Sequence, residues 1–141
     1  MLVRCLYASR AVEPLAPHAL ERILEKSRKN NPPRGITGLL CYSNGTFVQV
    51  LEGGRETVSS LLGTLFTDNR HTSLQLLLFE EIAERHFGNW NMGRVNIETM
   101  NLAALLKYSE KAELDPFSCS GRATLALLIE LASTGSIANR A

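Results

Sequence analysis

Polar side chains interrupt apolar rows of this sequence, and they are of types that form hydrogen bonds inside a protein. Tyr7 lies in a short strand-like run, and Gln49 stands between Phe47 and Leu51 on one face of another such run. A buried carboxamide has two donors and one acceptor, and each group left unpaired costs roughly 1 to 3 kcal/mol. A phenol and a carboxamide in such rows indicate a buried hydrogen-bonded pair or a shared ligand.

A third interrupted row lies on the first helical segment. Ile23, Ser27, Asn30 and Asn31 are spaced i, i+4, i+7 and i+8, so the apolar stripe becomes polar toward its C-terminal end. A planar heteroaromatic ligand edged with carbonyls and ring nitrogens, such as isoalloxazine, would satisfy both Asn side chains and Gln49 together. Each feature alone also has a structural explanation, because buried Tyr often bonds to backbone and Asn-Asn before Pro-Pro ends a helix.

The hydrophobic spacing predicts the elements that position these residues. The order β-α-β-β-α-β-β is an α/β (α+β) arrangement of the ferredoxin-like type with one additional strand, in which the first and third strands are neighbours. Tyr7 and Gln49 should therefore meet beneath the helices, and Asn44-Gly45 should form a hairpin turn. Strands are predicted over 2–10, 36–42, 46–52, 74–82 and 90–97, and helices over 16–31 and from after Gly54 to near Asp68.

Both faces of the predicted sheet are apolar, so both need a cover. The two helices cover one face. The other face carries Leu6, Ala8, Leu39, Cys41, Val48 and Val50. Two short C-terminal helices, over 102–108 and 123–131, could pack on that face or on another subunit.

Composition limits the classes of partner. The 141 residues are 45% hydrophobic and 21% charged with a net charge of +1, which favours one soluble domain and gives no support for a nucleic-acid or membrane partner. We expect a cytoplasmic protein, since there is no signal core and no apolar run near the roughly 20 residues of a membrane span. Three cysteines without CxxC spacing read as buried hydrophobes. His18 and His86 read as surface residues, and we expect no metal site.

Several strings, in this order and spacing, resemble the BLUF family, sensors of blue light using flavin. They are LVRCLYASRA, SRKNN, GITGLLCYSNGTFVQVLEG, DNRH and IAERHFGNWNMG. The resemblance runs from Leu2 to about Val95 and implies a photosensor domain over 1–97, with a helical extension over 98–141 in the same compact unit. The cofactor it implies is FAD, with FMN or riboflavin in recombinant material.

The resemblance also implies roles for individual residues. Tyr7 becomes the photochemical electron and proton donor, and Gln49 the amide that switches its hydrogen bonds, by rotation or tautomerisation. Trp90 and Met92 match a Trp-x-Met pair on the last strand beside the switching Gln, and they would relay the signal; whether Trp90 points inward or outward, or is plain core, stays open at this point. The cofactor-binding residues we expect are Ile23, Ser27, Asn30, Asn31, Gln49, Asp68, Arg70 and His71.

A short protein of this kind signals by changing its contacts. We therefore expect a homo-oligomer with a separate downstream regulatory protein, and no enzymatic activity of its own. Two rival interpretations stay open at this point. One is a small flavin-dependent or acyl-phosphate enzyme on the same scaffold, because fold does not fix function. The other is a non-catalytic oligomer module whose inward polar residues bind structural water.

Overall fold

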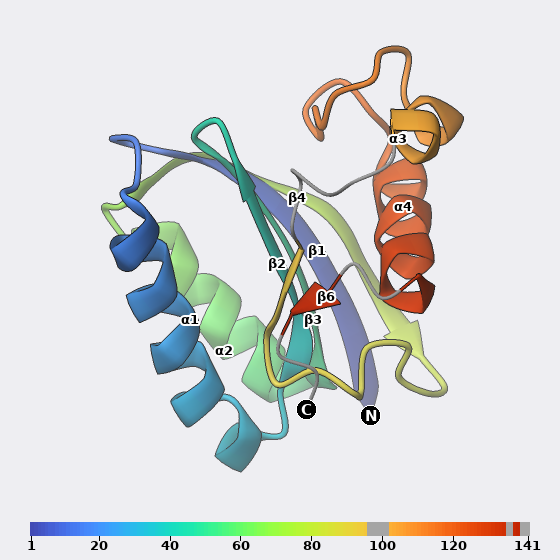
Figure 1. Cartoon of the computed structure of the whole chain (residues 1–141). Coiled ribbons are helices and arrows are strands. Elements are labelled where there is room, and N and C mark those ends of the chain that lie inside the picture. The colour runs from blue at the N-terminus through green and yellow to red at the C-terminus, as the bar shows by residue number, and fades with distance from the viewer. Residues whose placement is uncertain (96–101, 135–136, 139–141) are drawn as a thin grey trace.

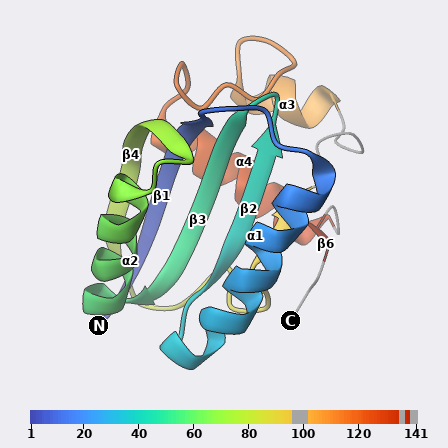
Figure 2. The same ribbon diagram turned by 90° about the vertical axis from the view of Figure 1, so that its left-hand side faces the viewer.

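A mixed sheet with helices on both faces forms the centre of the molecule (Figures 1 and 2). The computed structural model describes residues 1–95, 102–134 and 137–138. Within these ranges the strand order is β4-β1-β3-β2-β5-β6, antiparallel except for the parallel pair β2 and β5. The strands are β1 (Leu2–Ala11), β2 (Thr37–Ser43), β3 (Thr46–Gly54), β4 (His71–Ile82), β5 (Gly93–Val95) and β6 (Ile137–Ala138). The predicted ferredoxin-like α+β class is confirmed.

The helices lie in two layers. Helices α1 (Pro17–Asn30) and α2 (Arg55–Thr67) cover one face, and α3 (Leu102–Tyr108) and α4 (Gly121–Ser133) lie on the other side (Figure 1). Pro17 occupies the first position of α1, where its fixed φ favours the helix and its missing N–H costs nothing. The chain then turns through a short 3-10 helix, η1 (Pro32–Arg34). Among the described residues, no helix is long and apolar enough to cross a membrane.

The hairpin between β2 and β3 fixes the register of the central strands. Asn44 and Gly45 both have positive φ, at 49° and 76°, as the primed two-residue turns require. The turn pairs Leu40 with Gln49, and β3 in turn pairs with β1 so that Tyr7 lies opposite Gln49. The predicted hairpin and the predicted neighbours are both confirmed.

Each sheet face has its own hydrophobic core. The pocket-side core, beneath α1 and α2, contains Val3, Cys5, Tyr7, Leu20, Leu24, Ile36, Leu40, Phe47, Leu51, Val58, Leu62 and Met92. The tail-side core contains Leu6, Ala8, Leu39, Cys41, Val48, Val50, Phe87, Trp90, Val95, Leu105, Leu125, Leu127, Leu128 and Leu131. The C-terminal helices therefore cover the second face of their own sheet. Of the two predicted arrangements, packing on this face or on another subunit, the structure has the first.

The predicted last strand was wrong in its extent. The structure forms β5 over Gly93–Val95, so Trp90 and Met92 precede the strand, in the β4–β5 loop (residues 83–92). The Trp90 carbonyl accepts a hydrogen bond from the Gly38 N–H, but the loop binds other parts of the protein rather than extending the ladder. Ile97 and the boundary expected between residues 97 and 98 lie outside the described residues. Strand β6 was not predicted, because two residues carry no periodicity.

Candidate functional site

Tyr7 and Gln49 form a direct contact in the middle of the pocket-side core. They face each other across β1 and β3, and the Tyr7 hydroxyl donates a hydrogen bond to Gln49 Oε1. Tyr7 is 1% exposed and Gln49 is 7% exposed. Burial, with smaller effects from Cys5 and Asp68, raises the pKa of Tyr7 above its ordinary value of 10.0. The phenol therefore keeps its proton at neutral pH.

A cavity of about 230 Å³ opens above this pair, between α1 and α2. Tyr7, Gln49 and every residue expected to bind the cofactor line it: Ile23, Ser27, Asn30, Asn31, Asp68, Arg70 and His71. Segments far apart in the sequence thus meet around one pocket. Its other lining residues are Lys26, Arg34, Leu40, Phe47, Leu61, Thr64 and Leu65.

Asn30 and Asn31 have different surroundings although they are neighbours at the end of α1. Asn30 is exposed, whereas Asn31 is 5% exposed. The backbone N–H of Asn31 donates to the Ser27 carbonyl at 2.8 Å, but its side-chain amide makes no hydrogen bond with a described residue. Asn31 lines the cavity, so its amide is free to bond to a ligand there.

Asp68, Arg70 and His71 form a second polar group at the cavity, between α2 and β4. Asp68 Oδ2 lies 2.6 Å from a guanidinium nitrogen of Arg70, and hydrogen bonding from Arg70 lowers the pKa of Asp68 from 3.8 to about 2. His71 Nδ1 lies 2.8 Å from Ser9 Oγ. Burial lowers the pKa of His71 below its ordinary value of 6.5, although Asp68 opposes the shift. The group therefore combines a fixed ion pair with a histidine that is neutral at pH 7.

Met92 and Trp90 lie on opposite sides of the sheet. Gln49 Nε2 donates to the Met92 sulfur at 3.2 Å, so Met92 contacts the amide as expected. Trp90 is 5% exposed and belongs to the tail-side core, so it does not line the cavity. Met92 therefore lies beside Gln49, whereas Trp90, whose inward or outward position the sequence left open, lies in the other core, because the β4–β5 loop crosses between the two faces.

Some lining residues were missed from the sequence. Lys26 lies three positions after Ile23, so the helical spacing that identified Ser27 and Asn30 could have identified it too. Thr64 lies beside Leu65 on α2, and its polarity hid it among the surface positions of that helix. Arg34 follows the Pro pair in η1, where no periodicity predicts the direction of a side chain.

Comparisons with known proteins agree with this geometry. A family model described as "BLUF: Sensors of blue-light using FAD" matches residues 2–93. The photoactivated adenylate cyclase subunit beta of Euglena longa is 33% identical over 92 residues, which are 64% of this chain and 11% of the relative. The chain therefore spans about a tenth of that relative's length.

Two solved structures are similar over nearly the whole chain. The photo-activated state of BlsA has a TM-score of 0.81 and 31% identity, with 100% of this chain and 99% of that one covered. The dark-state structure of BlrB, titled a BLUF protein, has a TM-score of 0.76 and 30% identity, covering 95% and 96% of the two chains. The likeness thus includes the C-terminal helices as well as the sheet.

Proposed function

This chain belongs to the BLUF family of blue-light sensors that use FAD, and we propose that its switch is the hydrogen bond between Tyr7 and Gln49. BLUF domains are photosensors rather than enzymes, and FAD is the cofactor that defines them. The proposal rests on one contact: a buried phenol donates to a buried carboxamide at the cavity that lies between α1 and α2.

The residues around the cavity fit a flavin ring. Ile23 of α1 and Leu65 of α2 line it with apolar side chains, which suit the faces of an aromatic ring system. Asn31 and Gln49 add amides, which suit the carbonyl and imide edge of the same ring. Asn31 is the better placed of the two adjacent asparagines, because the residue is 5% exposed and its amide makes no hydrogen bond in the described part of the chain.

Tyr7 and Gln49 can move a proton along the hydrogen bond that joins them. Flavin, when bound and excited by blue light, supplies an oxidant that can take an electron from a nearby phenol. Loss of an electron makes the Tyr7 hydroxyl strongly acidic, and Gln49 Oε1 is the atom that already accepts its hydrogen bond. Gln49 then exchanges donor and acceptor positions by rotation or tautomerisation, which alters what its amide offers to Met92 and to the ligand.

The output of this switch is a change in protein contacts. Met92 contacts the Gln49 amide, and Trp90, two residues earlier, packs in the tail-side core with residues of α4. Leu102 and Leu106 of α3 are 63% and 54% exposed, which gives the tail an apolar surface for a second copy or a regulatory protein. Cyclase activity belongs to the longer relatives and is not proposed for this chain.

The light-minus-dark absorption spectrum tests the switch. The protein carrying FAD should shift its visible absorption to longer wavelength under blue light and recover in the dark. Tyr7→Phe and Gln49→Ala should both abolish the normal shift and still bind flavin, because the cavity keeps its other lining residues. A wild-type photocycle in Gln49→Ala would contradict the proposal, and so would a protein that binds no flavin.

A comparison of lit and dark samples tests the output separately. Light scattering should report a different assembly size, or hydrogen exchange a different protection of α4, in the lit sample. If both measurements are identical in light and dark while the red shift occurs, the switch stands and the proposed output is wrong.

A further inference from the structure

Glu52 is a fully buried carboxylate on the sheet face opposite to the cavity. It lies three residues after Gln49 on β3, and strand alternation turns the two side chains to opposite faces. Glu52 is 0% exposed, and Arg4, which faces it across β1 and β3, is 5% exposed. A buried charge is costly unless it is paired and hydrogen-bonded. The hydrogen-bond partners of Glu52 therefore indicate its role.

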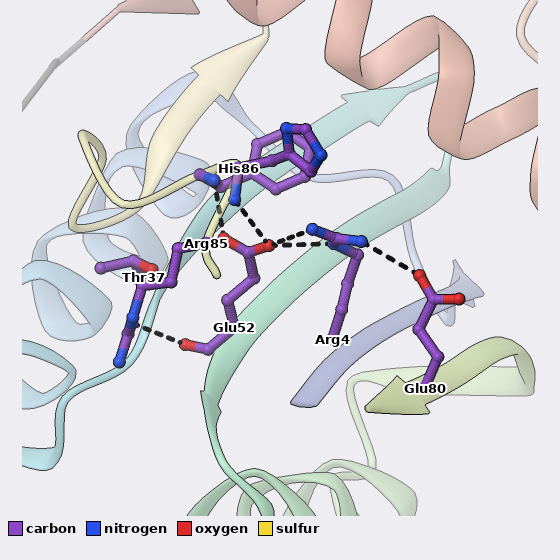
Figure 3. A network of polar contacts seen from close by, with 7 residues as sticks. Arg4, Thr37, Glu52, Glu80, Arg85 and His86 are labelled. Carbon is purple, nitrogen blue, oxygen red and sulfur yellow. Dashed lines mark hydrogen bonds and ion pairs between the residues drawn. The ribbon is translucent and has the colours of Figure 1, made fainter. Parts of the chain in front are cut away.

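Both carboxylate oxygens of Glu52 are used, and the β4–β5 loop supplies partners to each (Figure 3). Oε2 accepts from Arg4 Nε at 2.9 Å and from the His86 N–H at 3.1 Å. Oε1 accepts from the Phe87 N–H at 2.6 Å. The Glu52 carbonyl accepts from the Arg85 guanidinium at 3.1 Å. Three consecutive loop residues are therefore bound to one residue of the strand that carries the switch amide.

Arg85 binds the same loop to a second place. Its guanidinium donates to Oγ1 of Thr37, the first residue of β2, at 2.8 Å and to the carbonyl of Gly35, two residues before β2, at 2.7 Å (Figure 3 shows Thr37). The first half of the loop is thus fixed to β3 by Glu52 and to β2 by Arg85. Both strands also border the cavity, through Leu40 and Gln49.

The second half of the loop ends at the switch. Phe87 is 0% exposed, and Met92 lies five residues after it in the chain. The Met92 carbonyl accepts from Arg28 Nε at 3.1 Å, and its sulfur accepts from Gln49 Nε2 at 3.2 Å. A thioether is a weak acceptor, so the Gln49 contact cannot hold the loop by itself. Other bonds must therefore help to keep the sulfur on the amide: the Arg28 bond to the Met92 carbonyl and the bonds that fix the first half of the loop.

We propose that Glu52 is a positioning residue for the switch: it binds the β4–β5 loop to β3 and so holds the Met92 sulfur against the Gln49 amide. The inference rests on the proposed function only for its light-dependent readout, since the contact of Met92 with Gln49 involves no flavin. An ion pair with a purely structural role would stabilise the fold and leave that contact unchanged.

Glu52→Gln is the test variant. A glutamine has one acceptor oxygen and an NH₂ group, so it cannot accept from Arg4 and from both loop N–H groups as the carboxylate does. Glu81→Gln is the matched control, because Glu81 is a glutamate on β4 whose side chain is 63% exposed and pairs with the exposed Arg55. It removes the same charge without touching the loop.

Methionine-methyl NMR and amide exchange of the flavin-free protein give the first readout. In Glu52→Gln the Phe87 N–H should lose protection, and the Met92 methyl resonance should move toward that of a solvent-exposed methionine. Glu81→Gln should leave both unchanged. Loss of Phe87 protection with an unmoved Met92 resonance would overturn the proposal, as would full protection of Phe87 in Glu52→Gln.

The photocycle gives the second readout. Glu52→Gln should bind flavin like the wild type, and its dark recovery rate should change by about threefold or more, the factor that a fraction of one hydrogen bond's free energy produces in a rate. An unchanged recovery rate together with a displaced Met92 would also contradict the proposal. If the wild type shows no red shift, the proposed function fails, and the NMR comparison still decides the role of Glu52.

A second variant covers the case in which Glu52→Gln does not fold. Arg85→Gln removes the guanidinium bonds to Thr37, Gly35 and the Glu52 carbonyl from a partly exposed side chain, and it leaves the Glu52 carboxylate with Arg4 and the loop N–H groups. It should displace the Met92 resonance in the same direction and by a smaller amount. A Met92 resonance that does not move in Arg85→Gln would count against loop positioning.

Discussion

Replacement of Asn31 by Ala tests whether the cavity is a flavin site. The Asn31 side chain is buried, its amide has no partner among the described residues, and it lines the cavity. Its backbone hydrogen bonds, to the Ser27 carbonyl and from the Ile36 N–H, survive in the variant. Asn31→Ala should therefore remove ligand contacts without unfolding α1.

The expected loss follows from the number of hydrogen bonds that one amide can make. Two bonds to the flavin edge, at about 0.5 to 1.5 kcal/mol each, correspond to a Kd weakened by about 5- to 150-fold. Asn30→Ala is the matched control, because the same side chain one position earlier is exposed. It should weaken binding by no more than about threefold, which is within the range of a solvated contact.

Titration of the apoprotein with FAD, followed by the quenching of flavin fluorescence, measures both constants. Thermal unfolding of the two flavin-free variants checks that neither has lost its fold. Equal losses in the two variants, or an unchanged Kd in Asn31→Ala, would refute the argument that burial and an unused amide identify the ligand-binding asparagine.

Three further predictions concern groups around the same sheet. The phenolate absorbance of wild type and Tyr7→Phe should coincide during an alkaline titration until the protein unfolds, because burial raises the pKa of Tyr7 above 10.0. Burial also raises the pKa values of Cys5 and Cys41 from 9.0 to about 12. Thiols of the unfolded chain therefore ionise at a lower pH than those of the folded protein. The free energy of unfolding, measured in urea under reducing conditions, should fall above pH 9 by about 1.4 kcal/mol per thiol for each pH unit. The fall should be smaller in Cys→Ala variants. Gly121→Ala should lower the melting temperature, since an added Cβ would lie 2.7 Å from a β4 backbone carbonyl, whereas Gly63→Ala in α2 meets nothing within 4 Å and should raise it.

The switch pair could be predicted from the sequence because two short-range rules are enough to place it. Strand alternation assigned Tyr7 and Gln49 to the helix-covered face, and the Asn44-Gly45 turn fixed the register of β3. The order of the elements then made β1 and β3 neighbours. None of these steps needs knowledge of a distant loop.

Glu52 and Arg4 could not be recognised as buried in the same way. Alternation places them on the tail side of their strands, but both lie near a strand end, where a charged residue is ordinarily solvated. Their burial depends on Phe87, which arrives from the β4–β5 loop more than thirty positions later in the chain. The sequence does show a charged residue in an apolar row, but it does not show which distant residues pair with that charge.

The same loop explains why Trp90 lies away from Gln49. A strand through residues 90–97 would have placed Trp90 and Met92 on one face, because residues two apart share a side. The structure instead gives the loop a crossing before β5, with Trp90 in the tail-side core and Met92 in the pocket-side core. Periodicity cannot predict such a crossing, because the hydrogen bonds at its two ends come from distant residues: the Gly38 N–H donates to the Trp90 carbonyl, and Arg28 donates to the Met92 carbonyl.

That crossing also limits how a signal can leave the pocket. Strand β3 is paired on both sides and Gln49 is buried, so a change in the amide's hydrogen bonds has little room to move the strand itself. Met92 belongs to a loop, and loops can shift at lower cost than paired strands. Because Trp90 lies two residues away and packs with α4 residues, a shift of Met92 changes the packing beneath the tail helix. Fixing the first half of the loop at Glu52 confines such a shift to the segment that joins the two cores.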